Sequence, residues 1–121
     1  MNELNKVIGN YGEDLALSYL ISHNHKLIKR NYKKRNGEID IITTFKDIIV
    51  FTEVKTRSNN FYGKPCEYVD TRKQNRIKSL AKYFINVNKY YDYYIRFDVI
   101  EININNYNNE YNLNHLIDAF R

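Results

Sequence analysis

The chain has 121 residues and a formal net charge of +5, a size that suits one domain with its own hydrophobic core. Its single cysteine, Cys66, excludes an intrachain disulfide and fits a reducing compartment. The first six residues lack the apolar stretch of a signal peptide, and no apolar run approaches the roughly 20 residues of a membrane span. We therefore expect residues 1–121 to form a single cytoplasmic domain that does not enter a membrane.

The first third of the chain predicts a helix, a strand and a basic turn. Apolar residues such as Ile8, Leu15 and Tyr19 recur at helical spacing, which predicts a helix over residues 5–22. A short strand is expected over residues 26–32. The turn over residues 33–37 then carries three adjacent positive charges.

Two apolar runs, over residues 39–45 and 48–54, predict a β-hairpin around Lys46-Asp47. If these two residues form the loop, the numbers of opposed residues sum to 93, so Asp40 faces Glu53 and Glu38 faces Lys55. Opposed side chains in an antiparallel pair share a face and lie about 4.5–5.5 Å apart at Cβ. Lys-Asp is a weak turn signal, and a shift of one residue would place the two acids on opposite faces.

Two carboxylates this close repel each other unless a cation lies between them. A hard divalent cation such as Mg²⁺, held by one or two carboxylates and by substrate phosphate, would relieve the repulsion. Both faces of the hairpin are largely apolar, so we expect both to be covered: Ile42, Ile49 and Phe51 share the face of Asp40, and Ile39, Ile41, Val50 and Val54 line the other. Charges in a covered strand need partners or a metal. The pattern predicts metal-assisted phosphodiester chemistry; the alternative is a solvated sheet face with acids placed there by chance.

The second half of the chain predicts a loop, a helix, a long strand and a terminal helix. Asp70 or Thr71 can cap the first of these helices, which continues to about residue 87. The other elements are expected at residues 57–65 (a loop that is either a flap over substrate or an ordinary connector), 93–104 (strand), 105–112 (Asn-rich connector) and 113–120 (helix). This order predicts an α/β fold, with a central mixed β-sheet flanked by helices.

The basic residues are concentrated around the predicted hairpin. Residues 26–82 contain 15 Lys and Arg against 6 Asp and Glu, whereas the rest of the chain has a net charge of −4. A local positive field is typical of proteins that bind a phosphate backbone. The candidate phosphate contacts are Lys34, Arg35, Arg57, Lys73 and Arg76. The alternative is an ordinary solvated basic surface.

Glu13, Asp40, Glu53 and Lys55 form the pattern E…D…E-x-K. This pattern resembles the active-site signature of the restriction-endonuclease-like superfamily, which includes archaeal Holliday-junction resolvases. A closer resemblance is to the YraN-like family of small bacterial predicted endonucleases. It spans nearly the whole chain, and its carrying stretches are Gly12-Glu13, Arg30-Asn31, Gly37–Ile42, Phe51–Arg57, Lys73, Arg96–Val99 and Ala119-Phe120.

The resemblance implies a restriction-endonuclease-like fold with Mg²⁺ or Mn²⁺ as the cofactor. Asp40 and Glu53 are the expected metal ligands, and Glu13 is expected to reach the ion from the first helix, directly or through water. Lys55 would orient the attacking water or stabilise the pentavalent phosphorus. The expected partner is nucleic acid, in particular DNA that is branched or otherwise structured, and resolution of a symmetric junction would favour a homodimer.

Two other functions are compatible with the sequence. A nucleic-acid-binding or adaptor protein would keep the fold with little or no catalytic turnover. A structural interaction module would use the Tyr-rich segment at residues 90–94 as its contact surface. The E…D…E-x-K set favours the enzyme, because a pure binding protein has no need of opposed carboxylates.

Overall fold

The computed structural model describes residues 3–58, 69–105 and 107–121. The chain order is α1 (Glu3–Ser22), β1 (Lys26–Lys34), β2 (Gly37–Phe45), β3 (Ile48–Ser58), α2 (Thr71–Asn88), β4 (Tyr94–Ile104) and β5 (Tyr111–Phe120). Of the loop expected over residues 57–65, residues 57 and 58 are instead the end of β3, and residues 59–65 lie outside the described residues, as does the lone Cys66. The first six of these elements match the predicted ones in type.

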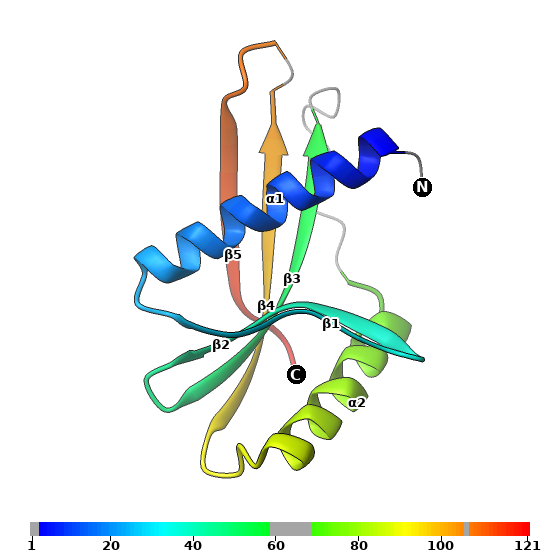
Figure 1. Ribbon diagram of the computed structural model, residues 1–121, viewed down its shortest axis with the longest axis vertical. Coiled ribbons are helices and arrows are strands. Elements are labelled where there is room, and N and C mark those ends of the chain that lie inside the picture. The colour runs from blue at the N-terminus through cyan, green and yellow to red at the C-terminus, as the bar shows by residue number, and fades with distance from the viewer. Residues whose placement is uncertain (1–2, 59–68, 106) are drawn as a thin grey trace.

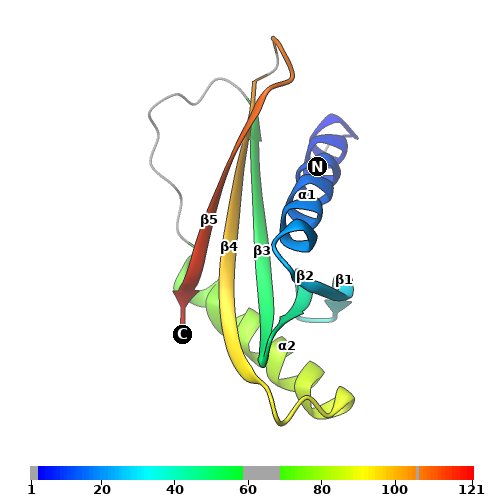
Figure 2. The same ribbon diagram turned by 90° about the vertical axis from the view of Figure 1, so that its left-hand side faces the viewer.

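The strands form one five-stranded mixed sheet in the order β1-β2-β3-β4-β5. Neighbouring strands are antiparallel except β3 and β4, which are parallel and are the two strands that α2 separates in the chain. A parallel pair needs such a crossover, whereas antiparallel neighbours are joined by short turns. The predicted α/β architecture is confirmed, and Figures 1 and 2 show α1 lying on one side of β3 and β4.

The two helices cover opposite faces of the sheet. Ile42 and Phe51 pack in a core cluster with α2, whereas Ile41 packs in a second cluster with Ala16 and Leu20 of α1. Successive strand residues point to opposite faces, so Ile41 and Ile42 identify the two faces. The prediction that both faces are covered is therefore confirmed.

Helix α2 begins where its cap was predicted. The carboxylate of Asp70 accepts a hydrogen bond from the backbone N–H of Lys73 at 2.8 Å, which satisfies one of the free donors of the first turn. The helix ends at Lys89, which adopts the left-handed conformation with φ 61°. Ile77, Leu80 and Phe84 form its buried side, so the charged residues of α2 face away from the core.

The C-terminal segment is a strand, and the predicted helix over residues 113–120 is wrong. A β-bulge between Phe97 and Val99 interrupts the pairing of β5 with β4. The apolar residues lie three to four positions apart because β5 buries side chains on both of its faces, against both core clusters. Leu116 and Phe120 pack against the α2-side cluster, and Leu113 against the α1-side cluster. The Asn-rich connector is the turn of this hairpin, closed by a 2.8 Å bond from Asn105 N–H to the Glu110 carbonyl.

At the bulge, the buried carboxylate of Asp98 accepts four hydrogen bonds. Asp98 accepts two bonds of 2.8 Å from the Arg96 guanidinium, one of 2.7 Å from His115 and one of 3.0 Å from the Asp118 N–H. Burial raises the pKa of Asp98, but these bonds outweigh it, so the pKa lies below its ordinary value. Arg96 and Asp98 form an ion pair within β4, and the bonds from His115 and Asp118 to the same carboxylate link β5 to β4.

Gly12 allows α1 to lie directly against β3. A Cβ atom at this position would lie 1.9 Å from Thr56 Oγ1 and 2.8 Å from Thr56 Cβ, which no real contact permits. Only a glycine therefore fits here, and the close approach fixes the height of the neighbouring Glu13 above β3. Gly9, one turn earlier in the same helix, has no atom within 4 Å of such a Cβ.

We expect Gly12→Ala to lower the free energy of unfolding by about 1–3 kcal/mol, because the helix must move away from Thr56. The matched control is Gly9→Ala, which gains helix propensity without a clash and should be neutral or up to about 1 kcal/mol more stable. Urea denaturation of the two variants measures the difference. Equal stability of the two variants would contradict the close packing of α1 on β3.

Candidate active site

The candidate site lies at the fork where β2 separates from β3. The hairpin has the predicted register, with Ile42 opposite Phe51 and Ile41 opposite Thr52. Its ladder of paired residues ends there, and β1 and β2 turn away to run between α1 and α2 (Figure 1). Asp40 and Glu53 are therefore the first residues beyond the fork rather than a further ladder pair.

The change of direction at Asp40 alters the two faces of β2. Ile39 belongs to the α2-side cluster, although the alternation predicts that it shares the face of Ile41. The ladder between β2 and β3 ends before Glu38, so Glu38 does not lie across from Lys55 as predicted. On the other side of β2, it lies opposite Lys33 of β1. Both differences arise because β2 leaves β3 after Ile41.

The Asp40 carboxylate occupies the fork itself. Its Oδ2 accepts a hydrogen bond of 2.8 Å from the Val54 backbone N–H. Burial and, after it, the negative charges of Glu53, Glu13 and Glu38 raise the pKa of Asp40 to about 8, although the Val54 bond opposes the shift. The fork therefore concentrates more negative charge than its surroundings neutralise.

Glu53 is buried beside Asp40 and forms an ion pair with α2. Its side chain is 9% exposed, and Oε1 lies 2.5 Å from the Lys73 ammonium. Burial alone would lower the pKa of Lys73, but the hydrogen bond and charge of Glu53 outweigh it and the pKa is raised. Lys73 thus supplies a positive charge at the acidic site. In this structure its ammonium contacts Glu53, whereas the sequence predicted that it contacts phosphate.

Glu13 approaches the same acids from α1. Its Oε1 lies 3.6 Å from Arg30 Nε, while the Arg30 guanidinium also holds Asp14 at 2.7 Å. Both Glu13 Oε1 and Arg30 Nε are buried without a hydrogen-bond partner. Burial raises the pKa of Glu13, Arg30 lowers it, and Glu38 and Glu53 raise it again, with a net increase.

Lys55 lies on the same side of β3 as Glu53, because residues two apart in a strand share a face. Both Lys55 and Arg57 are half-buried, and their Cα partners on β4 are Glu101 and Asn103. The structure therefore brings Glu13, Asp40, Glu53 and Lys55 to one region. It adds Arg30 and Lys73, the two cations that face the acids.

The side chains at the fork offer carboxylate oxygens, the kind of ligand that a hard divalent cation prefers. Carboxylate oxygens are the ligands of Mg²⁺, which keeps several waters and needs only one or two carboxylates together with substrate phosphate. Glu13 Oε1 is buried without a hydrogen bond and Asp40 has a raised pKa, and a cation would relieve both features. Within the described residues, however, no three Asp, Glu, His or Cys side chains are already arranged to hold an ion.

The predicted phosphate contacts separate into three places. Lys34, Arg35 and Arg76 line one cavity together with Arg72 and Tyr83, which the sequence analysis did not single out. Lys73 is at the acidic site, and Arg57 is on β3. A spacing of three to four residues along α2, from Arg72 through Arg76 and Ser79 to Tyr83, is the sequence signal that identifies the cavity face.

A five-stranded mixed sheet with a helix on each face and acids at the central fork is compatible with a restriction-endonuclease-like α/β domain. Comparison with known proteins identifies the family. The family model described as uncharacterised protein family UPF0102 matches residues 12–102. The chain belongs to this family, which confirms the YraN-like resemblance.

Relatives from several clostridia match the whole chain. The UPF0102 protein of Clostridium perfringens (strain 13 / Type A) is 49% identical over 121 residues, which cover 100% of this chain and 99% of the relative. The UPF0102 protein of Clostridium novyi (strain NT) is 44% identical over 120 residues, 99% of this chain and 100% of the relative. These names state a family and no activity. Neither described helix is long and apolar enough to cross a membrane.

The raised pKa of Asp40 predicts a specific pH dependence of stability. The folded protein holds this proton up to a pH of about 8, whereas an ordinary aspartate has a pKa of 3.8. The contribution of Asp40 to stability is therefore complete below pH of about 4 and is lost as the pH rises towards 8. Asp40→Asn cannot ionise but still accepts the Val54 bond, so this variant should lose that pH dependence.

At alkaline pH, we expect the free energy of unfolding of Asp40→Asn to exceed that of wild type by about 1 kcal/mol or more. The difference should shrink as the pH falls towards 4. Asp47→Asn, at the exposed turn between β2 and β3, is the matched control. Chemical denaturation across the pH range measures both. A difference from wild type that is the same at every pH would contradict the raised pKa.

Proposed function

We propose that this protein is a metal-dependent nuclease that hydrolyses phosphodiester bonds in nucleic acid, with DNA as the expected substrate. The observation that supports it is the convergence of three carboxylates, those of Glu13, Asp40 and Glu53, at a fork in the central sheet. Lys55 lies on the side of β3 that carries Glu53. A carboxylate cluster beside a lysine is suited to phosphodiester hydrolysis, in which negative charge develops on the phosphate.

Asp40 and Glu53 would hold Mg²⁺ or Mn²⁺, with Glu13 as a third ligand, directly or through water. When bound, the ion supplies electrostatic stabilisation of the scissile phosphate and lowers the pKa of an attacking water. Lys55 orients that water or places positive charge on the phosphoryl oxygens. Arg30 holds Glu13 from the side of β1, and the Gly12 contact with Thr56 fixes the helix that carries it.

Lys73 has a role that depends on the occupancy of the site. In the structure its ammonium neutralises Glu53, the acid that would bind the ion. If Glu53 held a divalent cation, the Lys73 ammonium would no longer be needed to neutralise it and would be free to contact the phosphate of the substrate. Its half-exposed side chain can make this movement without unpacking α2.

A second candidate is a nucleic-acid-binding or adaptor protein with little or no turnover. One observation favours it: Oδ2 of Asp40 is held by Val54, Glu53 is held by Lys73, and no three acids of the described chain are arranged as a ligand set. In this case Lys73 is a permanent partner of Glu53. The two candidates differ in whether divalent cations act on the protein.

Nuclease activity is tested on single-stranded, duplex and branched DNA with Mg²⁺ or Mn²⁺. We expect cleavage by the wild type and a loss of about 100-fold or more in Asp40→Ala and in Lys55→Ala, because each removes a charge that acts on the phosphate. Asp47→Ala, which removes an exposed acid of the same hairpin, should cleave as the wild type does. Cleavage that persists in both site variants would exclude this site, and absence of cleavage with intact binding would favour the adaptor.

Cation binding is tested separately through stability. In the presence of EDTA, we expect Lys73→Gln to be about 1 kcal/mol less stable than wild type, because it leaves Glu53 buried without its partner while the half-exposed lysine limits the loss. Mn²⁺ should restore stability to this variant. Lys82→Gln, at an exposed position of the same helix, is the control. Thermal unfolding that does not respond to Mn²⁺ in any of the three proteins would contradict a metal site.

A further inference from the structure

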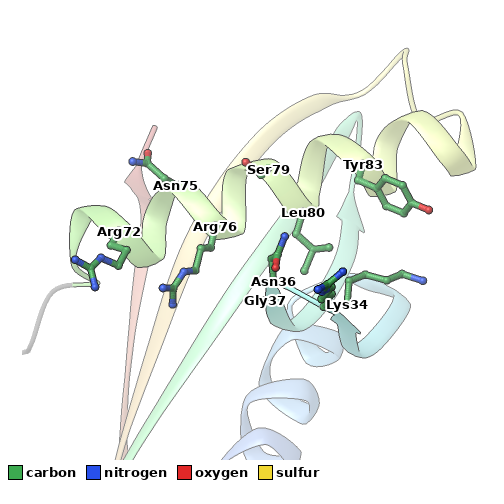
Figure 3. A pocket seen from close by; sticks show the side chains of 10 residues that line it. Lys34, Asn36, Gly37, Arg72, Asn75, Arg76, Ser79, Leu80 and Tyr83 are labelled. Atoms are coloured by element: carbon green, nitrogen blue, oxygen red, sulfur yellow. The ribbon is translucent and has the colours of Figure 1, made fainter.

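A groove of about 1040 Å³ lies between α2 and the turn that joins β1 to β2. Figure 3 shows Arg72, Arg76 and Tyr83 following one side of α2, opposite Lys34 and Asn36 from the turn. The complete lining is Lys34, Arg35, Asn36, Gly37, Arg72, Asn75, Arg76, Ser79, Leu80 and Tyr83. The groove is therefore built from two elements that are far apart in the sequence.

The groove is strongly cationic. Four Lys and Arg residues line it, and its described lining contains no carboxylate. Arg72 and Arg76 are one helical turn apart, and Lys34 and Arg35 come from the opposite wall. Positive charges on both walls of a concave surface attract a phosphate backbone that runs between them.

An aromatic ring accompanies these charges. Tyr83 is 51% exposed, although the other large aromatic residue of α2, Phe84, is buried in the core. The Lys34 ammonium lies 5.9 Å from the centroid of the Tyr83 ring and 5.4 Å from that of Tyr32. Side-chain amides of Asn36 and Asn75 and the Ser79 hydroxyl add hydrogen-bonding groups beside the ring.

We propose that this groove binds an unpaired segment of a nucleic-acid strand. Arg72, Arg76 and the basic turn contact its phosphates, and a base stacks on Tyr83. The proposal rests on the proposed nuclease function and deepens it, because it defines the substrate as nucleic acid that contains an unpaired strand.

The combination of groups favours an unpaired strand over a duplex. In a duplex the base faces are covered by stacking, so a protein aromatic ring cannot lie against them unless a base leaves the helix. Proteins that bind single strands combine a cationic groove with exposed aromatic rings, which is the combination found here. A duplex would contact the outer arginines but would leave Tyr83 and the amides without a partner.

The groove and the acidic fork are connected through the same two elements. Lys73, which contacts Glu53, lies between Arg72 and Arg76 in the first turns of α2. Gly37 of the groove begins β2, the strand that carries Asp40. An unpaired strand in the groove therefore lies on the structural elements that form the proposed cleavage site.

Binding is measured by fluorescence anisotropy in EDTA, so that the result does not depend on metal or cleavage. The probe is a fluorescein-labelled oligothymidylate of about 12 nucleotides, with the same length of blunt duplex and an oligouridylate as comparisons. We expect the single strands to bind about tenfold or more tightly than the duplex. The oligouridylate shows whether DNA or RNA is preferred.

Two variants test the residues of the groove. Arg72→Gln combined with Arg76→Gln removes two phosphate contacts and should reduce the slope of log affinity against log salt by about 1.4. Tyr83→Ala should weaken single-strand binding about fivefold or more without changing that slope. Lys82→Gln in α2 and Lys89→Gln directly after it remove exposed charges outside the groove, so they are the matched controls and should bind as wild type does. Circular dichroism and thermal unfolding confirm that each variant is folded.

The outcomes separate this proposal from the nuclease function. Equal affinity for single strand and duplex, or single-strand affinity unchanged in both groove variants, would overturn the proposal even if the wild type cleaves DNA. Loss of single-strand affinity in the groove variants would support the groove proposal even if cleavage persists in Asp40→Ala, a result that would exclude the fork as the cleavage site. A wild type that binds none of the probes would overturn it outright.

Discussion

One hydrogen bond, from the Val54 N–H to the Asp40 carboxylate, organises the centre of this protein. In a regular hairpin, the ladder would continue beyond Ile41 and Thr52, and a backbone carbonyl of β2 would accept the hydrogen bond from the Val54 N–H of β3. Here a side chain takes over this role, so β2 is free to turn away while the Val54 donor remains satisfied. The consequence is a fork that holds a carboxylate inside the sheet, where burial and the neighbouring acids disfavour its ionised form.

The cations around the fork balance this charge only in part. Lys73 neutralises Glu53, and Arg30 divides its guanidinium between Glu13 and Asp14. Asp40 accepts a hydrogen bond from a backbone donor, but burial and the charges of the neighbouring acids outweigh this bond, which is why its pKa stays high. Asp98 shows the opposite outcome in the same sheet, because an arginine, a histidine and a backbone N–H lower its pKa despite deeper burial. The difference marks the fork as a place that favours an added positive charge.

Much of this arrangement could be predicted from the residues. The hairpin register, the Asp70 cap and the mixed sheet follow from local patterns and are confirmed. The terminal strand could not be predicted, because both of its faces bury apolar residues and the resulting spacing of three to four is also that of a helix. The fork was missed for another reason: sequence periodicity assumes that a ladder continues, whereas a side chain that replaces a backbone acceptor ends it. The groove depends on the distance between α2 and the β1–β2 turn, which no local pattern contains.

Helix α2 links the two halves of the proposed function. Its buried side, with Ile77 and Phe84, fixes it on the sheet, and the remaining positions of its first turns point in two directions. Lys73 reaches the acids at the fork, while Arg72 and Arg76 line the groove. The basic residues in the first turns of α2 therefore have two tasks: Lys73 counters the acids within the protein, and Arg72 and Arg76 face outward along the groove. Because these three residues come from a single helix, a strand bound in the groove would be held at a fixed distance from Asp40 and Glu53, which is the positioning that hydrolysis of a phosphodiester bond requires.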